Sequence, residues 1–192
     1  MRYITIAALL MGGLCCTAGA AGNRGTEDAK QLHRKKLAQE TQIGGYACAK
    51  GYAWLYADGR LNECAVARET AFGEAHIPAG SWISLTKDGR PYFVFLEHVT
   101  EIAGYRCEGG NWLLGPTEGA MTGLYPSGKL KVCYLAGNQT VQGVPCAAAG
   151  LLASLHGVDP GVLFDESGKL RGCKLAKDYG RWKRGERFIQ GQ

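Results

Sequence analysis

The stretch that decides the fold is residues 165–176, which read Asp165-Glu166-Ser167-Gly168-Lys169-Leu170-Arg171-Gly172-Cys173-Lys174-Leu175-Ala176. Three earlier stretches follow the same pattern: Pro126-Ser127-Gly128-Lys129-Leu130-Lys131-Val132-Cys133-Tyr134-Leu135-Ala136, Lys87-Asp88-Gly89-Arg90-Pro91-Tyr92-Phe93-Val94-Phe95-Leu96 and Ala57-Asp58-Gly59-Arg60-Leu61-Asn62-Glu63-Cys64-Ala65-Val66-Ala67. Each has Asp or Ser, then Gly, then Lys or Arg, then an apolar-rich segment. Cysteine stands six residues after the Asp or Ser in three of the four.

A second landmark precedes each of these stretches: Gly45-Tyr46-Ala47-Cys48, Glu74-Ala75-His76-Ile77-Pro78, Gly104-Tyr105-Arg106-Cys107 and Gly143-Val144-Pro145-Cys146. Two landmarks that recur in a fixed order indicate an internal repeat. The units are residues 44–67, 74–97, 103–136 and 142–177. The third and fourth units are longer because they contain insertions at 108–120 and 147–160.

Each unit has the pattern of a β-hairpin, with Asp-Gly or Ser-Gly between two apolar, strand-forming segments. Asp-Gly suits a two-residue type I′ turn, in which both residues have positive φ. A short third strand, such as residues 140–144, links one hairpin to the next. We therefore expect an all-β fold, an array of four β-hairpin repeats forming an extended antiparallel sheet. The alternative is a β-solenoid, a coiled parallel arrangement of the same strands.

The N-terminus has the pattern of a secretory signal peptide. Arg2 is followed by a mainly apolar run at 4–14 and by the small residues Ala18-Gly19-Ala20. This run is too short for a membrane span, which needs roughly 18 or more apolar residues. We expect residues 1–20 to be removed by cleavage after Ala20, with Ala21 as the second choice, and the mature chain to be secreted or periplasmic.

After the signal peptide the sequence suggests three regions and no further membrane span. Residues 21–43 are a polar leader, within which 27–41 has the composition of a solvated helix. Residues 44–177 are the repeat domain, and residues 178–192 are a basic C-terminal tail. Cys15 and Cys16 leave N-terminal lipidation open, although the residues before them fit a lipidation site poorly.

Six cysteines remain in the mature chain, and an even number in an exported protein indicates disulfides. Units one, three and four have a cysteine at both landmarks, whereas unit two has neither, with Pro78 or Ala79 at the first and Val94 at the second. Cysteines that are absent together are expected to be partners. The predicted bonds are Cys48–Cys64, Cys107–Cys133 and Cys146–Cys173.

Neither a metal site nor a cofactor is expected. Cys-x-x-Cys and His-x-x-x-His do not occur, and the four histidines are scattered along the sequence. The formal net charge of +5 is mild for a chain of 192 residues. It permits weak attraction to anionic surfaces, and no nucleic-acid partner is expected.

No catalytic constellation stands out, so the protein is not expected to be an enzyme. Ser127 and Ser167 stand in hairpin turns, and no Gly-x-Ser-x-Gly nucleophile elbow occurs. Glu97 and His98 are neighbours on one strand, so they point to opposite faces. The alternative is an uncharacterised enzyme whose site is formed by the insertions 108–120 and 147–160, in a polar cleft that contains an acid and His156 or His98.

The aromatic residues supply the candidate binding positions. Trp54 and Trp82 lie at even offsets from their turns, so both rings are expected on one sheet face, in packing roles. Trp112 lies in an insertion and can stack on a sugar or peptide if it is exposed. In the tail, the adjacent Arg181, Trp182, Lys183 and Arg184 mix cations with an aromatic ring that suits an anionic envelope polymer.

The turn-centred units resemble MORN-type repeat variants of bacterial proteins over roughly residues 44–177. The matching positions are the turns at 58–60, 88–90, 127–129 and 167–169. The resemblance implies an extended sheet that serves as a scaffold or binding surface. We expect a non-enzymatic secreted or periplasmic module that binds an unidentified protein or envelope polymer. A structural envelope protein is an alternative.

Overall fold

The computed structural model describes residues 32–110, 121–148 and 161–191, which form strands and no helix. The first eight strands are β1 (His33–Leu37), β2 (Thr41–Ile43), β3 (Tyr46–Leu55), β4 (Leu61–Val66), β5 (Thr70–Phe72), β6 (Ala75–Ile77), β7 (Trp82–Leu85) and β8 (Pro91–Phe95). The others are β9 (Thr100–Ile102), β10 (Tyr105–Cys107), β11 (Thr122–Leu124), β12 (Leu130–Cys133), β13 (Gln139–Val141), β14 (Val144–Cys146), β15 (Val162–Phe164), β16 (Leu170–Lys174) and β17 (Arg187–Ile189). No membrane-spanning helix is present in these ranges.

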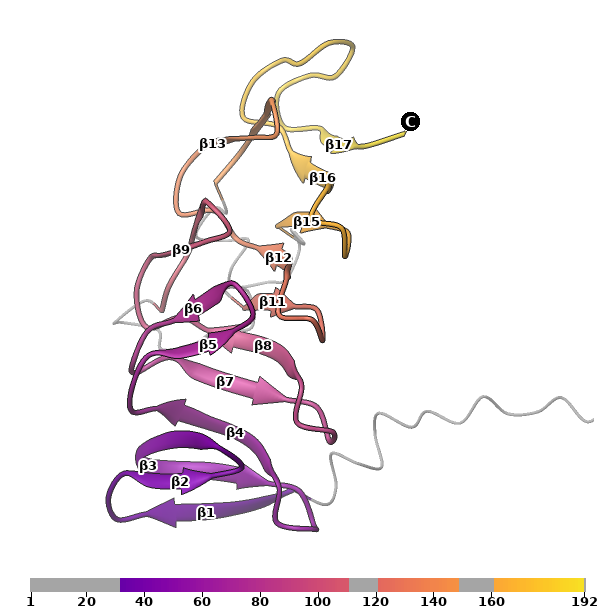
Figure 1. The fold of residues 1–192 in the computed structure, drawn as a ribbon. Coiled ribbons are helices and arrows are strands. Elements are labelled where there is room, and N and C mark those ends of the chain that lie inside the picture. The colour runs from indigo at the N-terminus through magenta and orange to yellow at the C-terminus, as the bar shows by residue number, and fades with distance from the viewer. Residues whose placement is uncertain (1–31, 111–120, 149–160, 192) are drawn as a thin grey trace, which may run out of the picture.

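One large sheet includes strands from both ends of the described chain. Its strand order is β1-β3-β4-β7-β8-β11-β12-β15-β16-β17, with β2 paired to the start of β3. Every pairing is antiparallel, and the ends of the order, β1 and β17, do not pair, so the sheet is open. Figure 1 shows it rising from β1 at the foot to β17 at the top. The all-β, antiparallel expectation is confirmed.

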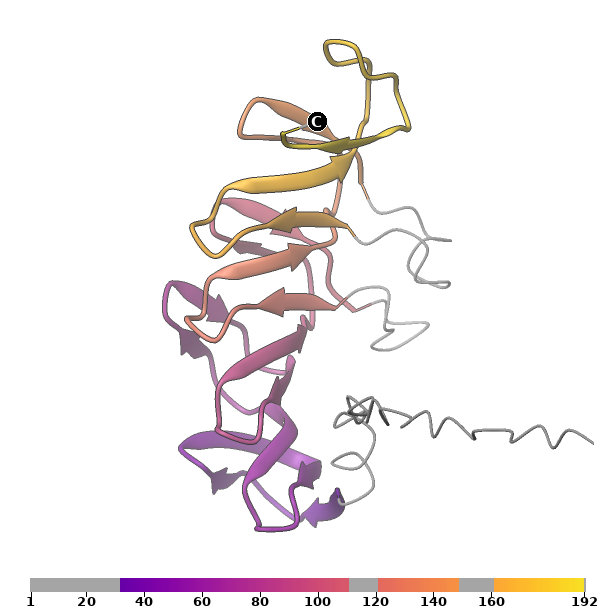
Figure 2. The same cartoon turned by 90° about the vertical axis from the view of Figure 1, so that its right-hand side faces the viewer.

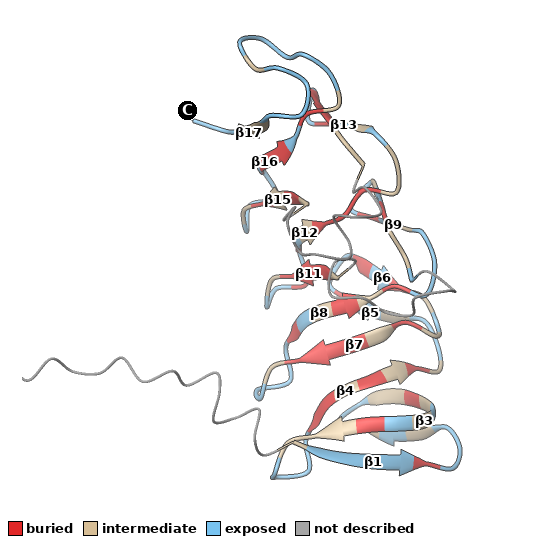
Figure 3. Cartoon of the chain, turned by 180° about the vertical axis from the view of Figure 1, so that it is seen from behind, coloured by how far each residue is buried: buried red, intermediate tan, exposed pale blue. Residues whose placement is uncertain are grey.

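Two kinds of hairpin alternate along the chain. The long hairpins β3–β4, β7–β8, β11–β12 and β15–β16 belong to the large sheet. The short hairpins are β2 with the start of β3, and the two-stranded sheets β5–β6, β9–β10 and β13–β14. The short hairpins form a second layer beside the large sheet (Figures 1 and 2). Their apolar residues and those of the sheet form one buried cluster between the layers, red in Figure 3.

The three disulfides connect these two layers. Each joins the last residue of a short hairpin, or its counterpart in β3, to the second strand of the next long hairpin: Cys48–Cys64, Cys107–Cys133 and Cys146–Cys173. The bonded Cα atoms lie 5.5–5.7 Å apart, within the usual range. The predicted pairing is confirmed.

In the second unit, the residue that takes the place of the first cysteine differs from the one predicted. Ile77, rather than Pro78 or Ala79, occupies the place of the first cysteine. Thr70 pairs with Ile77 across the β5–β6 hairpin as Thr100 pairs with Cys107 across β9–β10. Ile77 and Val94 are both fully buried, so aliphatic side chains occupy the positions held by sulfur elsewhere.

The turns of the long hairpins differ from the predicted type I′. In the first, the Gly59 N–H donates to the Tyr56 carbonyl at 2.8 Å and the Tyr56 N–H donates to the Arg60 carbonyl at 2.9 Å. Only Gly59 has positive φ, at 83°, while Asp58 does not. This is a three-residue loop, in which a turn is followed by a left-handed glycine. The other three long hairpins repeat both hydrogen bonds, so the prediction of two-residue loops is wrong.

Two-residue loops with two positive φ values occur in short hairpins instead. Ala103 and Gly104 have φ of 54° and 81°, and Gln142 and Gly143 have 50° and 86°. The pairing of Ile102 with Tyr105 leaves only Ala103 and Gly104 between the strands. The β9–β10 and β13–β14 hairpins therefore have the loop geometry expected for the long ones, whereas in the β5–β6 loop only Gly73 has positive φ.

Each long hairpin also contains a β-bulge at the same place. Ser84 pairs with Phe93 and Leu85 with Pro91, so Tyr92 is one residue extra on its strand. The corresponding extra residues are Asn62, Lys131 and Arg171. We call Asn62, Tyr92, Lys131 and Arg171 the bulge positions. Since a bulge redirects the side chains around it, its recurrence fixes where these four side chains leave the sheet.

Both ends of the described chain add strands to the sheet. Residues 33–37 form edge strand β1, where a solvated helix was expected, and its exposed His, Arg and Lys side chains are typical of a protected sheet edge. In the basic tail, β17 pairs with β16, and Trp182 and Phe188 pack against the buried cluster. The backbone of the tail therefore covers the last strand of the sheet, while most of its charged side chains are exposed.

Candidate functional site: the open face of the sheet

The large sheet has one face toward the short hairpins and one face away from them, which we call the open face. Along β7, Trp82 and Ser84 point to the open face, whereas Ile83 and Leu85 are buried in the core. The strand register carries this assignment across the sheet. One row of the open face consists of Trp54, Glu63, Ser84, Phe93, Gly123, Val132, Leu163 and Gly172.

Aromatic side chains are concentrated on the part of this face formed by β3, β7 and β8. Trp54, Trp82, Phe93 and Phe95 are half-buried, and Trp82 pairs with Phe95. Tyr52 is 43% exposed. The prediction that Trp54 and Trp82 share a face is confirmed, and both lie outside the core cluster. Partly exposed rings can bury further area against a partner.

The Tyr52 ring marks where this aromatic region meets the basic edge strand. The Arg34 guanidinium lies 4.6 Å from the ring centroid. Arg34 pairs with Trp54 in the β1–β3 register, so the cation belongs to the same face. A cation over a ring at this distance is an attractive contact that also holds the guanidinium against the sheet.

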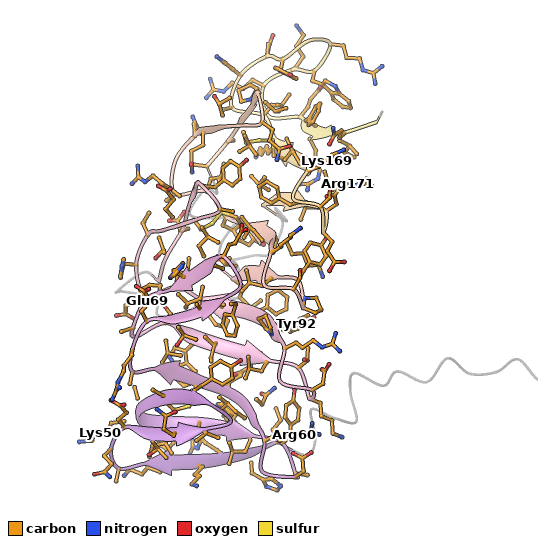
Figure 4. All side chains as sticks on the ribbon, in the orientation of Figure 1. Lys50, Arg60, Glu69, Tyr92, Lys169 and Arg171 are labelled. Atoms are coloured by element: carbon orange, nitrogen blue, oxygen red, sulfur yellow. A yellow bond between two sulfur atoms is a disulfide. The ribbon has the colours of Figure 1, made fainter. Side chains whose placement is uncertain are left out.

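The bulge positions form a line beside this row, one on every second strand. Adjacent strands are about 4.8 Å apart, so successive positions are separated by about 10 Å. Asn62 is buried and its amide donates to the Tyr56 hydroxyl at 2.9 Å. Tyr92 is 47% exposed, and Lys131 and Arg171 are also exposed. Figure 4 places Arg60, Tyr92, Lys169 and Arg171 along the same side of the sheet.

The charges at the turns differ between the two halves of the sheet. Asp58 bonds the Arg60 guanidinium at 2.7 Å, and Asp88 bonds that of Arg90 at 2.7 Å. The Arg60 hydrogen bond lowers the pKa of the Asp58 carboxyl. The hydroxyl of Thr86 is the main cause that lowers the pKa of Asp88. The first two turns therefore neutralise their own cations.

The third and fourth turns have Ser127 and Ser167 in place of these aspartates. In the described ranges, no carboxylate lies within 4 Å of the Lys131, Lys169 or Arg171 side-chain nitrogens. Asp165 is close enough to Arg171 for a Coulombic effect. The four cations Lys129, Lys131, Lys169 and Arg171 outnumber the acids Asp165 and Glu166, whereas Arg60, Lys87 and Arg90 are matched by Asp58, Glu63 and Asp88, so the C-terminal half of the sheet is the more positive half.

Asp165 acts mainly on its own turn. One oxygen accepts hydrogen bonds from the Ser167 hydroxyl at 2.6 Å and from the backbone N–H groups of Ser167 and Lys169. The Ser167 hydroxyl is the main cause that lowers the pKa of the Asp165 carboxyl. Its oxygen is thus committed to shaping the loop.

The predicted binding residues of the tail form a small ordered loop at the end of the sheet. The Arg181 guanidinium lies 5.2 Å from the centre of the Trp182 ring. The Lys183 ammonium bonds Asp178 at 3.1 Å, and the backbone N–H of Arg184 bonds the same carboxylate. Arg184 is exposed. Trp112 and the tips of both insertions lie outside the described residues.

A hollow of about 310 Å³ lies on the other face of the sheet. It is bounded by short hairpins β5–β6 and β9–β10 and by the turns of β11–β12 and β15–β16. Tyr105 and Phe164 stack in its wall with ring centroids 5.1 Å apart, and Glu74 and Lys129 also line it. This size reaches the lower end of small-molecule pockets.

The described residues contain no group of three or more His, Cys, Asp or Glu side chains that could hold a metal ion. Glu97 and His98 are exposed in the bend that follows β8, so they do not lie on one strand as expected. His76 bonds Glu69 at 3.0 Å on the surface. The site that the enzyme alternative places between the insertions lies mainly outside the described residues.

Sequence reasoning overlooked the bulge positions, although a signal for them exists. Each stands four residues after the turn Asp or Ser and two residues before the second cysteine or Val94. The residue before it is apolar in all four hairpins, whereas its own side chain changes from Asn to Tyr, Lys and Arg along the chain. Variable polar chemistry at a constant place indicates a surface position, as it is for three of the four residues, Asn62 being buried.

We compared the chain with protein-family models, curated proteins and solved structures. No protein-family model, curated protein or solved structure matches it. Three disulfides fit an extracellular or periplasmic location, where thiols are oxidised.

Proposed function

We propose that the protein is a secreted or periplasmic, non-enzymatic module whose open sheet face binds a protein or an envelope polymer. The observation that carries this proposal is the set of half-buried aromatic side chains on β3, β7 and β8, which includes Trp54, Trp82 and Phe95. The short hairpins cover the opposite face. Large aromatic side chains on the uncovered face of a sheet form a surface suited to binding a partner.

Rigidity supports the same proposal. The disulfides fix the short-hairpin layer to the large sheet at three places along its length. Hydroxyl groups also connect neighbouring long hairpins, as in the Tyr56 bond to the Leu85 carbonyl at 2.8 Å and the Tyr125 bond to the Phe164 carbonyl at 2.9 Å. A rigid surface loses little conformational entropy when it binds a partner.

We further propose that the four pairs of short and long hairpins are copies of one repeat, in the manner of MORN-type variants. Shared features support this: the three-residue turn loop, the bulge and the two positions of the cysteines. Repeated units give a binding surface with a regular spacing, which suits a partner that is itself extended.

Binding can be tested with the mature chain, prepared with its disulfides intact and immobilised for capture from envelope extract. The test variant is Trp54→Ser with Trp82→Ser, which removes two rings from the open face. We expect the wild type to retain a partner and the variant to lose most of it. The control variant is His76→Ser, at an exposed position of a short hairpin, which should retain the partner.

Each variant is first checked for three intact disulfides and an unchanged β-sheet circular dichroism spectrum. Equal capture by the Trp54/Trp82 double variant and the wild type would overturn the assignment of the open face. The captured partner is also incubated with and without the protein. Its chemical conversion only when the protein is present would instead favour an enzyme.

A further inference from the structure

We propose that three bulge positions, Tyr92, Lys131 and Arg171, form one line that binds an anionic polysaccharide. This inference rests on the proposed binding function of the open face and adds the chemistry of the ligand. The three residues are equivalent positions of successive long hairpins, because each is the extra residue of its bulge. Their side chains therefore leave the sheet in the same structural setting.

Spacing is the first argument. Two strand separations divide Tyr92 from Lys131, and two more divide Lys131 from Arg171, so the contacts repeat at about 10 Å. The rows beside them are in continuous register from Phe93 through Gly123 and Val132 to Leu163. The line is thus continuous and runs across the strands, as an extended polymer would.

Charge is the second argument. The N-terminal turns pair Arg60 and Arg90 with their own aspartates, whereas serine replaces those aspartates in the third and fourth turns. Lys131 is exposed, and its ammonium lies 5.7 Å from the centre of the Tyr125 ring on this side of the sheet. Lys169 stands beside Arg171 on the same side of the sheet (Figure 4) and adds to the positive field.

The mixture of side chains favours a sugar polymer over a nucleic acid. Along the axis of a duplex, each nucleic-acid strand has a phosphate about every 3.4 Å, so cations at about 10 Å would leave most of its charges unmatched. A polysaccharide with sparser acidic groups fits better. The exposed Tyr92 ring offers a flat apolar surface for a sugar ring, next to cations that take a carboxylate or sulfate.

Lys131 and Arg171 bind an acidic group in different ways. The Arg171 guanidinium can donate two parallel hydrogen bonds to a carboxylate, which fixes orientation. The Lys131 ammonium is a point charge on a flexible stem and tolerates variation in the position of the acid. The line therefore recognises charge at defined intervals and sugar at one end.

The test uses the full mature chain with its disulfides intact and measures affinity by biolayer interferometry. The acidic probe is hyaluronate, whose carboxylates stand on alternate sugars, and the neutral probe is dextran. We expect hyaluronate to bind, with an affinity that falls as salt rises, and dextran to bind at least about tenfold more weakly. Tyr92→Ala, Lys131→Gln and Arg171→Gln should each weaken hyaluronate binding by about three- to tenfold.

The matched control is Lys50→Gln, which removes one exposed cation from the opposite margin of the sheet (Figure 4). It lowers the net charge by the same amount as Arg171→Gln and should leave affinity within about twofold of the wild type. An equal loss in the two variants would overturn the inference, because it would show a response to net charge alone.

The same measurement also tests other classes of partner. Tighter binding of a single-stranded oligothymidylate, or of vesicles containing anionic phospholipid, with no effect of Tyr92→Ala, would overturn the glycan assignment. If hyaluronate does not bind while the Trp54/Trp82 double variant still loses its envelope partner, the inference fails and the proposed function stands. If that double variant loses nothing, the proposed function fails by itself.

Discussion

Ile77 and Val94 are a fully buried aliphatic pair at the two positions where the other hairpin pairs have bonded cysteines. Ile77 ends the short hairpin β5–β6, and Val94 lies in β8 of the next long hairpin. The second hairpin pair therefore joins the two layers by apolar packing alone. Burying both side chains gives a stabilisation of about 1.5–3 kcal/mol each relative to exposure.

We predict that Ile77→Cys combined with Val94→Cys produces a fourth disulfide. The new loop would be about as long as that of Cys48–Cys64, whose partners are 16 positions apart. A loop of this size is worth up to about 3 kcal/mol in the chain-entropy model, which offsets the methyl groups lost. Mass spectrometry of the unreduced, alkylated protein should find no free thiol at either position.

The single variants provide the comparison. Ile77→Cys alone and Val94→Cys alone should each be destabilised by about 1–3 kcal/mol in urea unfolding, because each leaves a cavity without a bond. Two alkylated thiols in the double variant would show that the two positions are not equivalent to the cysteine pairs.

Gly128 and Gly168 have the same left-handed conformation in equivalent turns, but only Gly128 is covered. Their φ angles are 83° and 86°. A Cβ atom at Gly128 would overlap the backbone of Phe72, at the tip of a short hairpin, whereas one at Gly168 would meet open space. We predict that Gly168→Ala costs about 1–2 kcal/mol, from backbone strain alone.

Gly128→Ala carries the same strain and must also displace the β5–β6 hairpin. Overpacking adds about 1–3 kcal/mol, so its urea midpoint should fall clearly below that of Gly168→Ala. Equal midpoints for the two variants would mean that the β5–β6 tip does not rest on the β11–β12 turn.

The cysteine pairing was predictable from sequence because the second unit lacks both cysteines at once. That argument needs no geometry, only the order of the landmarks. The turn type was not predictable in the same way. Asp58-Gly59 is compatible with loops of two or three residues, and the choice depends on which flanking residues pair. Here Tyr56 and Arg60 close the loop.

The two ends of the sheet and the bulge positions were hidden for different reasons. Strand β1 contains Arg34, Lys35 and Lys36, and such a composition is that of an edge strand as well as of a solvated leader. A bulge such as that at Tyr92 inserts one residue without changing the apolar pattern before it. Its presence follows from pairing across two strands, which a single stretch of sequence does not contain.

Tyr125 supplies a test of the connections between long hairpins. Its hydroxyl donates to the Phe164 carbonyl at 2.9 Å, across to the next long hairpin. We predict that Tyr125→Phe lowers the free energy of unfolding by about 0.5–1.5 kcal/mol, since one hydrogen bond is lost and the ring is kept. Tyr92→Phe, at an exposed ring, should change it by less than about 0.5 kcal/mol. Matching losses in urea unfolding would refute the role of the Tyr125 bond.

The last prediction concerns the acid titration of Asp165. The Ser167 hydroxyl, followed by the Lys169 N–H, lowers the pKa of the Asp165 carboxyl below its ordinary value. A lowered pKa in the folded state means that the ionised carboxylate stabilises the turn at neutral pH. This stabilisation is lost as the pH falls through the folded-state pKa. Ser167→Ala removes the hydroxyl and keeps both backbone donors, so it should raise the pKa of Asp165 part of the way back. A carbon-detected NMR titration of the carboxyl resonance measures this directly.

Thr86→Val is the parallel change in the second turn. It should raise the pKa of Asp88, because the Thr86 hydroxyl is the main cause that lowers that pKa. If the Asp165 titration does not move in Ser167→Ala, then the backbone N–H groups alone lower the pKa of the carboxyl, and the assigned role of the Ser167 hydroxyl is wrong.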